Sequence, residues 1–317
     1  MKKLVIYTSF SFLLDSFDLA LRGRYNDDHF HTITFRDHPQ RIFDKIKSET
    51  EAGMQTADIV IGPHWLILDL QRGGLLRGHE SREFDAYSDG FFDAKAGWGA
   101  MALSPVGFTY NTRLVDPKEA PSSLEGVTQP RWLGRLAVHS IIENSEGRMG
   151  LIYLTALRRL LGPAKWDELV GRLAGLRPTA YECMPDMALA ISKGEKQVGF
   201  PTTLSCISYY LEVQNRPIVH RMPEDLPYLA TFSPSMAVTA GGENEEIADR
   251  AFDYAMSEDW QQRVESFGGK TSPRRDVSDG KSIPEDAEYF PVMQDLQNQE
   301  VCMDMLRRKL QTEAPVR

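Results

Sequence analysis

The chain has 317 residues, which suits two domains of ordinary size, and 42% of them are hydrophobic, enough for a core in each. Its net charge of -9 argues against nucleic-acid binding, because phosphates require clustered Lys and Arg. The sequence has no apolar run near the roughly 20 residues that a membrane span needs.

The first part of the chain predicts strands alternating with helices. The apolar and amphipathic patterns predict a strand at residues 4–7, a helix at 12–22, a mixed strand at 29–36, a helix at 41–51 and a buried strand at 58–62. Polar loops follow the first and last of these strands. They contain Thr8, Ser9 and Ser11 in one case, and His64 with Trp65 in the other.

The carboxyl ends of parallel strands meet at one edge of a sheet, where ligands gather. We therefore expect the hydroxyls of Thr8, Ser9 and Ser11 to contribute to a binding site. His64 would add a hydrogen-bonding group and Trp65 a stacking face at the same edge.

The second part of the chain predicts a similar alternation. A strand is expected at residues 198–200, and helices are expected at 149–161, 166–173 and 185–193. Ser145, Gly147 and Arg148 precede the first of these helices, and free N–H groups at a helix N-terminus attract anions. Thr202, Thr203 and Ser205 follow the strand at 198–200. We expect these six residues to bind a ligand.

The chain then predicts a strand at 236–239, a Gly-Gly turn, two helices and the pair Arg274-Arg275. The order of these features over residues 232–277, with VGFTYN at 106–111 and PRWLGRLAV at 130–138, resembles the extracellular solute-binding proteins of ABC importers. The resemblance is to the branch that holds ferric-iron-binding and thiamine-binding proteins. By this resemblance, Arg275 lies where an arginine reaches the ligand.

The resemblance implies an α/β fold with two lobes, the type 2 periplasmic-binding-protein fold, with the ligand in the cleft between lobes joined by crossing strands. The expected lobes are residues 1–104 with 230–273, and residues 105–229 with 274–317. The implied function is a substrate-binding protein, working as a monomer with a membrane permease. The implied location is periplasmic or extracellular, with the export signal absent from this sequence, which begins Met1-Lys2-Lys3 before an apolar strand.

Ferric-iron relatives hold the metal with paired tyrosines, a histidine and an acidic residue, by the same resemblance. Here the tyrosine positions fall near Leu204 and Ser205, and Tyr209-Tyr210 comes a turn or more later. We therefore expect no metal ligands. The predicted ligand is a small anionic or hydrogen-bonding solute: a phosphate ester, a phosphonate, a carboxylate or a thiamine-like molecule. A ferric-iron-binding protein and a cytosolic ligand sensor of the same fold are the alternatives.

An enzyme is not expected. The sequence contains no GxSxG, HExxH, Walker or dinucleotide-binding motif, so we expect no catalytic residues and no cofactor. The three cysteines, Cys183, Cys206 and Cys302, lack metal-site spacing and are expected to be free thiols. A disulfide between Cys183 and Cys206 stays open, since an oxidising compartment would permit it.

Overall fold

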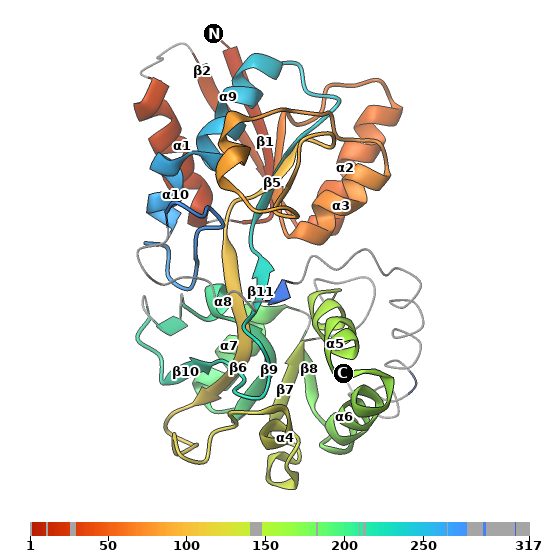
Figure 1. Cartoon of the computed structure of the whole chain (residues 1–317), viewed down its shortest axis with the longest axis vertical. Helices are drawn as coiled ribbons and strands as arrows, with labels where there is room; N and C mark the ends of the chain where they lie inside the picture. The colour runs from red at the N-terminus through yellow and green to blue at the C-terminus, as the bar shows by residue number, and fades with distance from the viewer. Residues whose placement is uncertain are drawn as a thin grey trace. The chain divides into compact units, whose positions relative to one another are not determined.

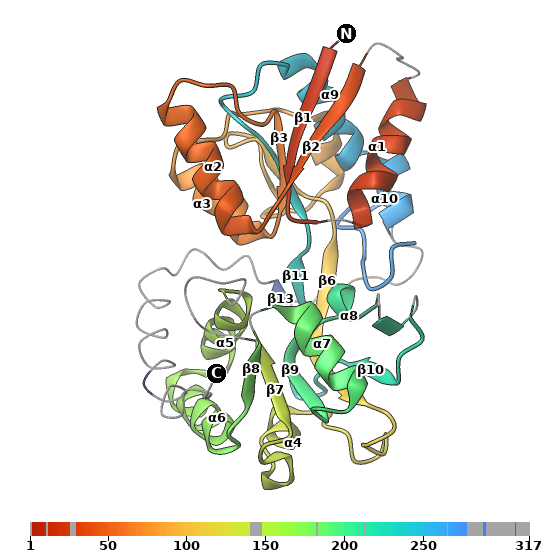
Figure 2. The ribbon, with the colours of Figure 1, turned by 180° about the vertical axis from the view of Figure 1, so that it is seen from behind.

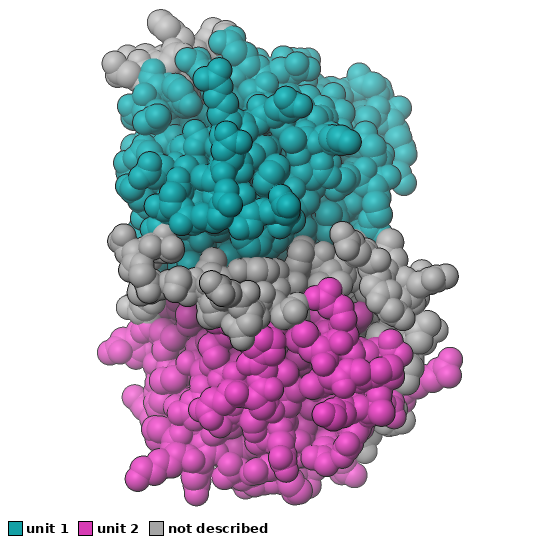
Figure 3. Space-filling view, viewed as in Figure 1, with its two compact units in different colours: residues 1–103, 232–282 teal, residues 104–231, 283–317 magenta. Residues whose placement is uncertain are grey.

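A computed structural model describes residues 2–10, 12–25, 30–139, 148–181, 183–208, 210–211, 214–264, 266–277, 288–289 and 308. The chain divides into two compact units, coloured separately in Figure 3. Unit 1 comprises Met1–Leu103 and Phe232–Ser282, and unit 2 comprises Ser104–Thr231 and Ile283–Arg317. No described helix is both long and apolar enough to cross a membrane.

Unit 1 contains a sheet with helices on both faces (Figure 1). The described strands run in the order β2-β1-β3-β12-β5-β4. They are β1 (Lys2–Thr8), β2 (Phe30–Arg36), β3 (Ile59–Gly62), β4 (Phe92–Asp93), β5 (Trp98–Ala100) and β12 (Ser235–Val238). The first three are parallel, whereas β12 is antiparallel to β3 and β5.

Helices cover both faces of this sheet, as the two ribbon views show (Figures 1 and 2). One layer holds α2 (Pro39–Glu51) and α3 (His64–Arg72). The other holds α1 (Phe12–Tyr25), α9 (Glu245–Met256) and α10 (Glu258–Val264). A 3₁₀ turn, η1 (Arg82–Ala86), lies against α9. This arrangement buries the periodic apolar faces that predicted the helices.

Unit 2 is built around a second mixed sheet. Its described strands run in the order β13-β11-β6-β9-β7-β8, and β10 also pairs with β6. They are β6 (Leu103–Asn111), β7 (Leu136–His139), β8 (Thr179–Tyr181), β9 (Val198–Thr203), β10 (Ile218–Arg221), β11 (Leu229–Phe232) and β13 (Glu288–Tyr289). Strands β7, β8 and β9 are parallel, and β6 runs antiparallel to β9.

The helices of unit 2 lie on both faces of its sheet (Figure 2). On one face are α5 (Arg148–Leu161) and α6 (Pro163–Gly175), and on the other are α7 (Met184–Lys193) and α8 (Leu204–Ser208). Two shorter pieces precede β7: α4 (Leu124–Val127) and η2 (Pro130–Trp132). With unit 1, these layers confirm the expected α/β class.

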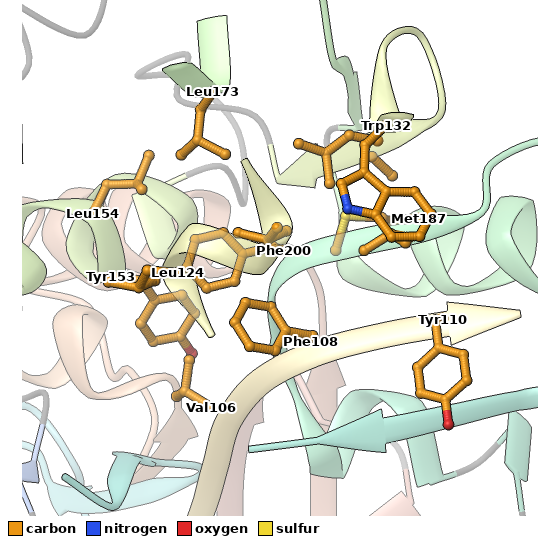
Figure 4. Packing of buried hydrophobic residues seen from close by; sticks show 14 of the residues in the cluster. Val106, Phe108, Tyr110, Leu124, Trp132, Tyr153, Leu154, Leu173, Met187 and Phe200 are labelled. Carbon is orange, nitrogen blue, oxygen red and sulfur yellow. The ribbon is translucent and has the colours of Figure 1, made fainter. Parts of the chain in front are cut away.

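The core of unit 2 is formed where these helices meet the sheet (Figure 4). The rings of Phe108 and Phe200, on neighbouring strands, have centroids 4.9 Å apart. Both side chains are buried, as is Tyr153 of α5. Burial of such large side chains supplies most of the favourable free energy of folding.

The end of unit 1 differs from the expected division, which assigned residues after 273 to the second lobe. Arg274 is buried and forms ion pairs with Glu83 at 2.6 Å and Asp276 at 2.8 Å, and its Nη1 also donates to Met256 O. A buried guanidinium requires such partners, so this cluster keeps residues 274–277 with unit 1.

Candidate functional site

Polar residues gather at one edge of the sheet of unit 1. The parallel strands β1 and β3 end there, at Thr8 and Gly62, and the antiparallel β12 begins there, at Ser235. Ser9 continues the pairing, because its N–H donates to Ile61 O at 3.2 Å. The expected edge therefore carries Ser9 and His64, and also Ser235, which the sequence pattern did not single out.

The hydroxyls of Thr8 and Ser9 have different surroundings. The Oγ1 of Thr8 is fully buried, accepts from Phe10 N at 3.0 Å and donates to Phe10 O at 3.3 Å, which closes a small turn. The Oγ of Ser9 is buried, and no described residue hydrogen-bonds to it. Ser11 lies outside the described residues. Of the two described hydroxyls, that of Ser9 keeps its hydrogen-bonding capacity for another group.

His64 is the first residue of α3, and its side chain is held by one polar contact and by two aromatic rings. Its Nδ1 lies 3.0 Å from Ser235 Oγ, and its ring packs edge-on against Trp98 and Phe232, with centroids 4.6 and 4.8 Å away. Burial lowers the pKa of His64 to about 3, since the imidazolium would lose its hydration. The side chain is therefore neutral near pH 7 and offers hydrogen bonds without charge.

Two other predicted residues of unit 1 have structural contacts. Trp65 is 3% exposed, so its indole lies within the core instead of forming an open stacking face. Arg275 is exposed, and its guanidinium donates to Asp85 O at 2.6 Å and Ala86 O at 3.4 Å, at the end of η1. The burial of Trp65 and the hydrogen bonds of Arg275 give both side chains a structural role that does not require a ligand.

A second polar edge lies in unit 2, where the parallel strands β7, β8 and β9 end. His139, the last residue of β7, is buried, and its Nδ1 accepts from Gly150 N at 3.2 Å. This bond places the first turn of α5 against the end of β7. Arg148, expected just before this helix, is the first residue of α5, and its side chain is not described. Ser145 and Gly147 lie outside the described residues.

Thr202 lies within β9 instead of in the expected loop, and internal partners satisfy its hydroxyl. The Oγ1 donates to Gly107 O at 3.1 Å. It also lies 2.9 Å from Thr109 Oγ1 and 3.2 Å from His220 Nδ1. Because the single proton goes to the carbonyl, Thr109 and His220 are the donors in the other two bonds. The residue is fully buried.

Thr203 and Ser205 lie at the end of the same strand. The hydroxyl of Thr203, the last residue of β9, contacts Met184 Sδ at 3.1 Å, a weak acceptor. The N–H of Ser205 donates to Ser104 Oγ at 2.9 Å, and the Ser205 side chain is half-buried. Ser104 and His139 are further polar residues of this edge. Both interrupt apolar strand patterns, which is the signal that could have identified them.

The remaining predictions concern cysteines, tyrosines and metals. Neither Cys183 nor Cys206 forms a disulfide in the structure, and Cys302 lies outside the described residues. Tyr210 packs against the hydrophobic core of unit 2, while Tyr209 is not described. Among the residues that the structure describes, no three His, Cys, Asp or Glu side chains form a group that would hold a metal ion.

Both the sequence and the fold of this chain are similar to those of known proteins. A sequence model of the family described as bacterial extracellular solute-binding protein matches residues 55–299. The match spans most of the chain and includes parts of both units. No curated protein has a sequence that matches this chain.

Several solved structures are similar across nearly their whole length. One is a substrate-binding protein of an ABC transporter from Agrobacterium tumefaciens, with 15% identity and a TM-score of 0.81 over 98% of this chain and 94% of that one. Iron-bound HitA from Pseudomonas aeruginosa has 16% identity and a TM-score of 0.78, over 97% and 99%. AfuA from Actinobacillus pleuropneumoniae, with fructose-6-phosphate bound, has 16% identity and a TM-score of 0.76, over 98% and 99%. Because the sequence identities are low, these similarities bear on the fold alone, and they confirm the expected type 2 periplasmic-binding-protein fold.

Proposed function

The chain belongs to the family of bacterial extracellular solute-binding proteins, and from this membership we propose that it is the substrate-binding protein of an ABC importer. The observation that carries the proposal is the family match over residues 55–299. The proposed location is periplasmic or extracellular, and the proposed protein partner is a membrane permease. A binding protein needs no nucleophile or general base, which agrees with the absence of a catalytic motif from the sequence.

In unit 2, the proposed binding groups lie at the carboxyl edge of the sheet. The first turn of α5 contributes N–H groups and the positive end of the helix dipole, and Arg148 would add a charge-assisted contact. His139 accepts one N–H of this turn, from Gly150, and we propose that a ligand accepts those nearer the N-terminus. Thr203 adds a hydroxyl whose one described partner is a thioether, and Ser205 adds another. This set favours a solute with anionic or strongly accepting groups.

In unit 1, Ser9 and His64 are the proposed binding groups. The Ser9 hydroxyl is buried without a described partner, and a buried polar group of this kind gains about 1–3 kcal/mol when it is satisfied. The His64 imidazole is neutral and held by Ser235, so it would bind a polar group in a fixed direction. Neither residue adds a formal charge at this edge.

A ligand panel tests the proposal directly. Unfolding temperature would be measured with phosphate esters, phosphonates, carboxylates and thiamine, with fructose-6-phosphate included because AfuA is similar in fold. A solute that binds only the folded state stabilises it by about 2.7 kcal/mol at 100 times its Kd. We expect one class to raise the unfolding temperature and to be released unchanged. Turnover of the compound would contradict a binding function, and no shift with any anion or hydrogen-bonding solute would contradict the solute class.

Variants then test the site. We expect Arg148→Ala and Thr203→Val each to weaken binding of the solute found in the panel by about tenfold or more, with nearly unchanged unfolding temperature. Thr202→Val is the matched control, because it removes a neighbouring hydroxyl whose partners are internal. Normal solute affinity in both test variants would show that the site is misassigned.

Ferric iron is the competing ligand, because HitA, a protein of the same fold, is iron-bound. Hard Fe(III) requires anionic oxygen donors such as phenolates. At the positions where the family resemblance places the tyrosine pair, this chain has Leu204 and Ser205, and Tyr210 packs against the core. We expect no visible absorption band when Fe(III) is added. A phenolate-to-iron band that disappears in Tyr209→Phe or Tyr210→Phe would establish iron instead.

A further inference from the structure

A hollow in unit 2 combines three cationic side chains from separate segments. Its volume is about 660 Å³, within the range of small-molecule sites. Arg113 follows β6, Lys193 ends α7, and Arg216 precedes β10. Polar groups of Ser192, Gln214 and Asn215 line the remaining wall.

The hollow is separate from the site proposed above. Asn111 ends β6 and its N–H donates to Gln197 O at 3.0 Å, immediately before the start of β9. The hollow therefore lies at the amino end of β9, whereas Thr203 lies at its carboxyl end. By the usual rise per residue of a strand, these ends are roughly 17 Å apart.

Hydrogen bonds hold the segments that form the hollow in fixed positions. Asn111 is 2% exposed, and its Nδ2 donates to Ile191 O at 2.7 Å in the last turn of α7. Its Oδ1 accepts from Arg113 N at 2.9 Å. The N–H of Thr112 donates to Pro217 O at 2.8 Å, which joins the same turn to the segment before β10. The cations thus project from a preorganised backbone, which lowers the entropic cost of binding.

None of the three cations forms an ion pair within the described part of the chain. Arg216 instead donates from Nε to Gln214 Oε1 at 3.0 Å. Other exposed arginines vary in this respect: Arg22 and Arg172 have carboxylate partners, whereas Arg131 and Arg275 donate to backbone carbonyls. The C-terminal end of α7 carries the negative end of the helix dipole, which stabilises the positive charge of Lys193 but not that of the two arginines. Two further arginines beside it, in a protein of net charge -9, call for an anion.

We propose that this hollow binds a compact polyanion that carries two or more phosphate or carboxylate groups. Each guanidinium forms paired hydrogen bonds with one such group, and the Lys193 ammonium and the amides of Gln214 and Asn215 take the remaining oxygens. All three cationic side chains are exposed, so a soluble ligand can reach them. The site is independent of the proposed solute site.

Titration calorimetry of the full chain with pyrophosphate and with citrate, at low ionic strength, tests this inference. We expect binding of at least one probe, weakened about tenfold or more in the double variant Arg113→Gln/Arg216→Gln. The matched control is Lys118→Gln/Lys165→Gln, which removes two positive charges from exposed positions of unit 2 outside the hollow. We expect its affinity for the probes to stay within about twofold of the parent.

Three outcomes would overturn the inference: no binding of either probe, equal weakening in both double variants, or binding only to vesicles of anionic phospholipid. Equal weakening would indicate a general effect of net charge. The solute identified by the ligand panel provides a separate readout, because Arg113→Gln/Arg216→Gln should bind it like the parent. Failure of the panel leaves this test unaffected.

Discussion

Thr202 and Thr203 are neighbours on β9, yet their hydroxyls have different kinds of partner. Successive residues of a strand point to opposite faces. Thr202 therefore joins a buried network with Gly107 O, Thr109 and His220, whereas the one described hydrogen-bond partner of the Thr203 hydroxyl is the sulfur of Met184. A network in which every donor is used stabilises the fold, and a hydroxyl with a weak partner is the better candidate for a ligand.

Replacement of Thr202 measures this difference at the scale of one residue. Thr202→Val keeps the shape of the side chain but leaves Gly107 O, Thr109 and His220 without their shared partner. We expect the unfolding free energy to fall by about 1–3 kcal/mol, measured by urea denaturation. The double variant Thr109→Val/Thr202→Val should lose less than the sum of the single changes. Strict additivity would contradict the network.

At the scale of elements, the close approach of α5 to β7 depends on Gly150. A methyl group at this position would lie 2.7 Å from His139 O and 3.0 Å from His139 Cβ, closer than folded proteins allow. The contact with backbone cannot be relieved by a side-chain rotation. The same approach permits the hydrogen bond from Gly150 N to His139 Nδ1, which positions the start of the helix proposed to bind the solute.

A pair of glycine substitutions tests this packing. In a helix, Gly→Ala ordinarily stabilises a protein by up to about 1 kcal/mol. We expect Gly150→Ala to destabilise instead, by about 1–3 kcal/mol, because α5 must move away from β7. The control is Gly171→Ala in α6, where an added methyl meets nothing within 4 Å and should stabilise. Thermal unfolding measures the change in stability of both variants, which we expect to have opposite signs. A stabilised Gly150→Ala would exclude the close contact between Gly150 and His139.

On the scale of the whole molecule, each unit contains a histidine that is kept neutral. Burial lowers the pKa of both His64 in unit 1 and His220 in unit 2 to about 3, from an ordinary value of 6.5. The Nε2 of His220 is buried, and no described residue hydrogen-bonds to it. Since each imidazole gains a proton far more easily in the unfolded chain, acid favours unfolding of both units.

The expected pH dependence follows from the sign of these shifts. As pH falls below 6.5, the unfolded state binds protons that the folded state does not, so stability decreases until pH reaches about 3. Each histidine contributes a slope of up to about 1.4 kcal/mol per pH unit. Urea denaturation between about pH 6.5 and 4.5 measures this slope. The interval stops above pH 3.8, because the lowered pKa of Asp276 makes its own contribution to the pH dependence below that value.

Variants assign this slope to the two histidines. Asn retains a nitrogen near the position of Nδ1 and does not titrate, so His64→Asn/His220→Asn should flatten the dependence in that interval. An unchanged slope in the double variant would show that other groups cause the acid sensitivity. Each single variant should remove about half of the slope, because the two sites lie in different units.

The periodic pattern of the sequence was enough to predict the α/β class, most of the strands and helices, and the polar character of two sheet edges. Local apolar spacing determines which segments become helices and strands, so it can be interpreted without knowledge of their neighbours. The order of these segments was also enough to identify the family.

The tertiary structure alone decided which polar groups are already satisfied. The partners of Thr202 lie 18 to 95 positions away in the sequence, and those of Arg274 include Glu83, 191 positions away. The cationic hollow likewise joins three segments that share no motif. Hydrogen bonds and charges act over a few ångströms of space, and distance along a chain does not determine which atoms folding brings within that reach.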